Sequence, residues 1–119
     1  MPFEPASHED ARNPGSLKRV LFRKDELSSG HVQMVNWACL PASKSFRIHY
    51  HQDMDEIFVI ITGEVEITVA DERAALGPGD AVLIPMKAAH RMVNTGSVDV
   101  EYIVIGISRG TGGKTVVTE

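Results

Sequence analysis

The stretch that decides the fold is residues 49–63, HYHQDMDEIFVIITG. It begins with two histidines two positions apart, and residues so spaced on a β-strand point to the same face. Four turn-forming residues follow, so a hairpin would bring the Glu56 carboxylate back beside the two imidazoles. Asp53 and Asp55 could compete with Glu56, although their place in a turn favours solvated charges. Two histidines inside a barrel need a partner, and a metal ion bound at roughly 2.0–2.1 Å from each nitrogen supplies one.

The rest of the chain, working outward, is predicted to form one short strand after another. Strands are predicted over residues 17–27, 32–40, 46–51, 57–61, 64–69, 81–84 and 98–107. No segment shows a sustained helical period, and many short strands separated by turn residues are typical of a sandwich or barrel. The run 57–61 is apolar on both faces, which indicates a strand covered on both sides. One cover would be the barrel interior, and the other could be a subunit partner.

The composition limits the classes of function. A chain of 119 residues fits one domain, and a formal net charge of −4 argues against a nucleic-acid-binding surface, which needs a basic patch. The single cysteine, Cys39, allows no disulfide within the chain and is predicted to be buried, because it lies in an apolar run. Neither a signal peptide nor an apolar run of membrane-spanning length is found, so a cytoplasmic protein is expected.

The two ends of the chain show no apolar period. We predict an arm or disordered lead-in over residues 1–16, a barrel over 17–108 and a loose, glycine-rich tail over 109–119. His8 and His31 have no partners close in sequence, so each is expected to be an ordinary core or surface histidine.

A second polar cluster, HRMVN at residues 90–94, follows the predicted strand 81–84 and the stop at Pro85. Together with the first stretch it resembles the two motifs of the cupin superfamily. Residues 49–63 have the pattern His-x-His-x4-Glu-x6-Gly, and residues 79–94 have Gly-x5-Pro followed by His-x3-Asn.

The resemblance covers about residues 40–106, and it departs from the family pattern at two glycines, which are Ser43 and Lys87 here. It implies an all-β fold, the cupin double-stranded β-helix or jelly-roll barrel, in a small single-domain cupin.

The resemblance also implies a metal site made by His49, His51, Glu56 and His90. The ion would be one divalent transition metal: iron, manganese, nickel, zinc, copper or cobalt, since this set of ligands selects none of them by affinity alone. Four protein ligands leave positions open on an octahedral ion, as in catalytic sites. A purely structural ion is the alternative.

Side-chain parity predicts which other residues face the pocket. Arg47 lies two residues before His49, Phe58 shares the face of Glu56, and Met92 shares the face of His90. Arg47 would either bind an anionic group of the substrate or pair with an internal carboxylate. For Phe58 and Met92 the alternative is ordinary core packing.

The function expected from the resemblance is a metal-dependent enzyme acting on a small organic molecule by Lewis-acid activation. A dioxygenase is favoured over an isomerase or lyase, and a non-catalytic cupin that binds or senses a small ligand is the alternative.

A homodimer is also expected, because two apolar rows should point away from the metal. The rows are Ile57, Val59 and Ile61, and Ile103, Ile105 and Ile107. The alternative is that residues 17–40 cover both rows within one chain.

Overall fold

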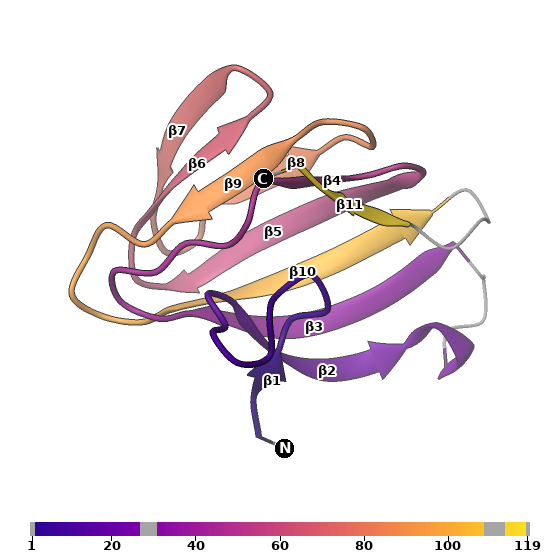
Figure 1. The fold of residues 1–119 in the computed structure, drawn as a ribbon, viewed down its shortest axis with the longest axis horizontal. Helices are drawn as coiled ribbons and strands as arrows, with labels where there is room; N and C mark the ends of the chain where they lie inside the picture. Colours follow the sequence, from indigo (N-terminus) through magenta and orange to yellow (C-terminus); the bar gives the residue numbers. More distant parts are fainter. Residues whose placement is uncertain (1, 27–30, 109–113, 119) are drawn as a thin grey trace.

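The computed structural model describes residues 2–26, 31–108 and 114–118, which form strands and one short 3-10 turn (Figure 1). The elements are β1 (Glu4–Pro5), β2 (Leu17–Arg23), η1 (Lys24–Glu26), β3 (Val32–Leu40), β4 (His49–His51), β5 (Met54–Thr62), β6 (Val65–Val69), β7 (Glu72–Leu76), β8 (Ala81–Ile84), β9 (His90–Val93), β10 (Val100–Ser108) and β11 (Thr115–Val117). None of the described segments is a helix with the length and apolarity needed to cross a membrane.

The strands form two antiparallel sheets, which confirms the predicted all-β cupin architecture. The six-stranded sheet has the order β1-β2-β3-β10-β5-β8, and the five-stranded sheet has the order β11-β4-β9-β6-β7. The inward-facing residues of both sheets make one apolar core, because alternate residues of each strand point to the same side. Members of this core include Leu40, Phe46, Ile60, Ile67 and Met92.

The motif glycine Gly63 has a φ of 83° in the turn before β6, a conformation that glycine adopts without strain. Ser43 and Lys87 stand where the family pattern has glycine, and they have φ values of 65° and 67°. The chain therefore keeps the left-handed backbone at both departures, and each side chain adds strain there.

The segment expected to be an arm or lead-in lies against the barrel where the structure describes it. Its strand β1 pairs with β2, and the N–H of Ala6 donates to the carbonyl of Ser16 at 3.0 Å. Gly15 passes so close to the carbonyl of Ser45 that a Cβ there would collide with it.

The tail expected to be loose includes β11, whose three residues pair with β4 (Figure 1). Residues 109–113 and 119 of that tail lie outside the described part of the chain.

The outer face of the six-stranded sheet is largely apolar. One row of register neighbours crosses five of its strands. The row consists of Phe22, Val35, Ile105, Ile57 and Leu83. Phe22 and Leu83 are 51% and 58% exposed. The idea that residues 17–40 cover the apolar rows is wrong, because β2 and β3 lie beside β10 in the same sheet and extend that face.

Candidate metal centre

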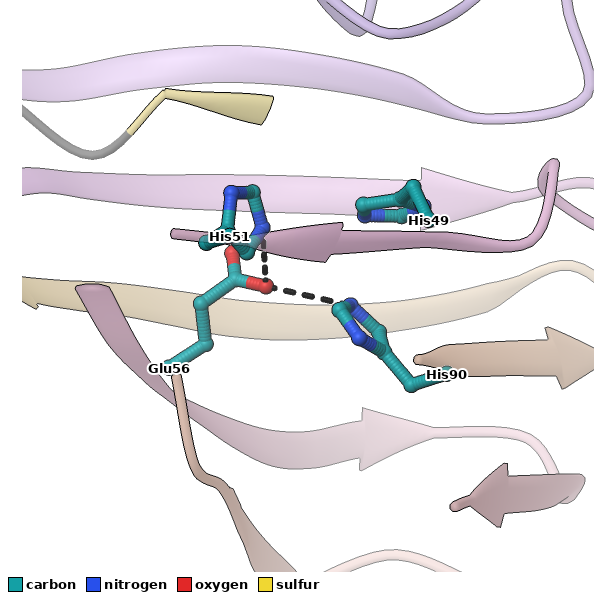
Figure 2. Close-up of side chains that lie close together, drawn as sticks. All are labelled: His49, His51, Glu56 and His90. Atoms are coloured by element: carbon teal, nitrogen blue, oxygen red, sulfur yellow. Dashed lines mark hydrogen bonds and ion pairs between the residues drawn. The ribbon is translucent and has the colours of Figure 1, made fainter. Parts of the chain in front are cut away.

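Four polar side chains meet between the two sheets. His49 and His51 come from β4, and His90 comes from β9, where it is the register neighbour of His49. Glu56 comes from β5 in the opposite sheet, and Figure 2 shows its carboxylate reaching toward His51 and His90. Each of the four alternates with a less buried neighbour, so strand parity alone turns them inward.

The four residues are close enough to share one ion. One donor atom from each lies within 4.8 Å of the others, and all four side chains are buried. Glu56 Oε1 is 2.8 Å from His51 Nε2 and 3.2 Å from His90 Nε2. The structure thus brings together all four residues expected as ligands, whereas Asp53 and Asp55 make other contacts, with Ser108 Oγ and the N–H of Met86.

The outward nitrogen of each histidine has its own partner. His49 Nδ1 donates to the carbonyl of Arg47 at 2.6 Å, and His90 Nδ1 donates to the carbonyl of Ala88 at 3.0 Å. His51 Nδ1 lies 3.1 Å from Thr115 Oγ1 of β11. A carbonyl can only accept, so Nδ1 carries the hydrogen in His49 and His90, and Nε2 faces the cluster. Partners of this kind fix the orientation of metal-binding histidines.

The charges in the cluster suit a cation. Burial lowers the pKa of His49 to about 3, helped by the nearby His8 and His90, so His49 is neutral at neutral pH. Burial alone would raise the pKa of Glu56, but its contacts with His51 and His90 outweigh this effect and hold the pKa at about 2. The cluster therefore presents an ionised carboxylate beside a neutral imidazole, which is the donor chemistry that a divalent transition metal binds.

One buried atom also indicates that a partner belongs in the cluster. His90 Nε2 is fully buried and makes no well-oriented hydrogen bond to a described residue, although Glu56 Oε1 is near. Buried polar atoms are almost always paired. A metal ion among the four donors would satisfy this nitrogen, so the residues present fit the group.

A cavity of about 270 Å³ opens beside the cluster and is lined by three of its members, His49, His51 and Glu56. Phe58 lines the cavity, as parity predicts. The wall of the cavity is mostly apolar, and His8 and Thr115 are among the residues that add polar groups to it.

Two residues expected in the pocket lie elsewhere. The prediction for Arg47 is wrong: its side chain is exposed, because residues 46–48 precede β4 and the alternation slips between buried Phe46 and buried His49. The prediction for Met92 is also wrong: it shares the inward face of His90, but it is fully buried in the apolar core and does not line the cavity.

Two residues that contact the cluster were not predicted from the sequence as part of the site. His8 stacks on His49 with ring centroids 4.1 Å apart and planes inclined by 26°. Thr115 contacts His51 from β11. Both contacts join residues far apart in the chain, and no local motif marks either one.

A jelly-roll barrel with three histidines and a glutamate meeting inside it defines the class of protein, and comparison with known sequences agrees. The cupin domain family matches residues 36–106, and the chain belongs to that family.

Among curated proteins, the uncharacterized protein MJ1618 of Methanocaldococcus jannaschii is 28% identical over 89 residues, which are 75% of this chain and 70% of that protein. Mannose-1-phosphate guanylyltransferase ManC of Salmonella typhimurium is 22% identical over 81% of this chain, which spans only 21% of that enzyme.

Among solved structures, a predicted oxalate decarboxylase from Thermotoga maritima superposes with a TM-score of 0.79 at 23% identity, covering 91% of this chain and 93% of that one. KdgF from a Halomonas species gives a TM-score of 0.71 at 17% identity, covering 92% and 90%. Likeness at this level shows a shared fold.

Proposed function

We propose that this protein is a metal-dependent cupin enzyme that acts on a small organic molecule. In this proposal His49, His51, Glu56 and His90 hold one divalent transition-metal ion. The observation that carries it is the meeting of four buried donors at the wall of a cavity.

The placement of the donors supports catalysis over a closed structural site. Four protein donors leave two positions of an octahedral ion to other ligands, and three of the four donors line the cavity. A molecule held against Phe58 would reach the ion from that side. The ion would supply Lewis-acid polarisation of a substrate oxygen.

The cavity sets the size of the substrate. Its volume of about 270 Å³ lies just under the range of roughly 300–1,000 Å³ typical of pockets for drug-sized ligands. The mostly apolar wall would bind a compact carbon skeleton, with its oxygen atoms directed to the cluster.

The reaction class we favour is dioxygenation, since the ligand set extends the two-histidine, one-carboxylate arrangement of non-haem iron oxygenases. Lyase or isomerase chemistry is the second candidate. Two points support this candidate. Such reactions need no oxidant, and solved structures with a similar fold include a predicted oxalate decarboxylase and a DMSP lyase.

The test begins with protein purified without chelators, whose metal is measured by elemental analysis. Metal-free protein is then reloaded with each of the six candidate ions and given a panel of diketones, flavonols and phenols, with oxygen uptake and product masses recorded. We expect oxygen uptake with iron and at least one substrate. Product formation without oxygen uptake would assign a lyase or isomerase instead, and ligand binding without turnover of any compound would favour a binding or sensing protein.

A further inference from the structure

The N-terminal segment contacts the candidate metal centre directly. The ring of His8 stacks on the ring of His49, and it also meets the edge of Phe46 at a centroid distance of 5.6 Å. The His8 side chain is only 14% exposed. One face of the His49 imidazole is therefore covered by a residue that lies outside the two cupin motifs.

A second contact comes from the next residue along. The Glu9 side chain is 3% exposed, and its Oε1 lies 3.3 Å from His8 Nε2. Oε1 also accepts from the N–H of Arg47 at 3.3 Å, while Oε2 accepts from the N–H of Gly15 at 3.2 Å. One buried carboxylate thus joins three places in the chain.

Glu9 is connected to His49 through the backbone of Arg47. The N–H of Arg47 is held by Glu9, and the carbonyl of the same residue accepts the hydrogen from His49 Nδ1. Arg47 precedes β4 and lies between two residues whose backbone groups pair with other elements: the N–H of Phe46 donates to the carbonyl of Met92, and the carbonyl of Ile48 accepts from the N–H of Thr118. The N-terminal segment therefore supplies one of the contacts that fix the backbone position on which the hydrogen bond of His49 depends.

We propose that His8 and Glu9 are positioning residues for His49, and that the N-terminal segment is part of the metal centre. His8 fixes the face of the imidazole, and Glu9 fixes the carbonyl that selects its tautomer. The proposal rests on the proposed function only in that a metal binds at this cluster. Outer partners of ligating histidines typically change metal affinity by about 10–100-fold.

The first test measures affinity for Co²⁺ alone, by competition with a chelator, in the full chain. We expect His8→Ala and Glu9→Ala each to weaken binding by about tenfold or more. His8→Phe keeps an aromatic ring against His49 and should recover most of the affinity. Glu9→Gln keeps one acceptor oxygen and should be intermediate. Arg12→Ala is the matched control, because it removes an exposed ion pair with Asp10 in the same segment and should leave affinity unchanged.

The second test needs no metal. Correlation of the ring nitrogens and carbon-bound hydrogens of His49 by NMR near neutral pH should show one tautomer, with the hydrogen on Nδ1, in the wild type. Glu9→Gln, and Glu9→Ala if it folds, should add the tautomer with the hydrogen on Nε2. A residue that merely supports the fold would lower the melting temperature and leave the tautomer unchanged.

The outcomes separate the two proposals. If the wild-type protein binds none of the six candidate ions, the proposed function fails, while the tautomer measurement still decides the roles of His8 and Glu9. If the wild type binds metal and both alanine variants bind it equally well with an unchanged tautomer, the positioning roles are overturned and the proposed function stands.

Discussion

At the scale of single residues, the alternation of a strand is enough to place the histidines of β4. Their spacing of two positions predicts one inward face, and the structure puts both rings in the cluster. The same rule fails for Arg47, only two residues earlier, because residues 46–48 do not continue the strand. Parity therefore locates a side chain only as far as the regular strand extends.

The clearest prediction at this scale is loss of metal. Replacing both His49 and His51 by alanine removes two of four donors and leaves Glu56 buried without its 2.8 Å partner. We expect elemental analysis to find most of the bound metal gone. His31→Ala is the control, since His31 lies outside the cluster. Full retention of metal in the double variant would mean that the ligands are elsewhere.

A second prediction concerns backbone strain at Lys87. Its φ of 67° is a conformation that glycine adopts freely, and the N–H of Lys87 donates to the carbonyl of His51. Lys87→Gly should relieve the strain of the left-handed conformation, although glycine also gives the unfolded chain more conformational freedom. The net effect we expect is a free energy of unfolding raised by about 0.5–1 kcal/mol. Thermal unfolding measures this, with Lys44→Gly as a control that should destabilise the protein. A lower melting temperature for Lys87→Gly would contradict the argument.

The third prediction concerns Cys39. Burial raises the pKa of its thiol to about 11, and the negative charges of Asp99 and Glu101 act in the same direction. A raised pKa favours the neutral thiol, so at pH 8 only about one molecule in a thousand carries the reactive thiolate. We expect native protein to react slowly with a thiol reagent at pH 8, faster as the pH approaches 11, and fully at pH 8 in denaturant. Rapid labelling of native protein at pH 8 would show an accessible thiolate.

At the scale of elements, strands with a strong apolar pattern are predictable and the others are not. β3 and β8 begin and end where the sequence predicts. β7 was missed because its sequence, ERAAL, is mostly exposed and has little β-branched character. β11 was missed because it follows a glycine-rich stretch and is stabilised by pairing with β4, which no local pattern reveals.

The contribution of β11 to the site can be tested at Thr115. Thr115→Val keeps the shape of the side chain but leaves His51 Nδ1 without its partner, which costs roughly 1–3 kcal/mol for a buried polar atom. We expect weaker metal affinity, by about tenfold. Thr115→Ser keeps the hydroxyl and should bind metal as the wild type does. Equal affinity in all three proteins, measured by chelator competition, would show that β11 does not support the site.

At the scale of the whole molecule, we propose a homodimer built on the outer face of the six-stranded sheet. Two polar side chains of this face make contacts within the chain: Trp37 Nε1 donates to Glu101 at 2.6 Å, and the Arg19 guanidinium lies 4.1 Å from the centre of the Phe3 ring. What remains in the centre is an apolar surface, which suits an identical face related by a two-fold axis better than a charged partner.

Sedimentation at micromolar concentration should therefore show one species of twice the 13.0 kDa chain mass. Leu83→Glu places a charge on an exposed position of this face and should shift the equilibrium to the monomer without loss of fold. Lys44→Glu, away from this face, should remain dimeric. A single wild-type species near 13.0 kDa would refute the dimer.

The two histidines of β4 are held from both directions of the chain, His49 by His8 and His51 by Thr115. During synthesis the ribosome makes His8 before the two histidines and Thr115 well after them. The nascent polypeptide thus carries a histidine pair whose surroundings stay incomplete until Thr115 has been made. An ion that needs the finished geometry could therefore bind only after β11 has been made and has paired with β4.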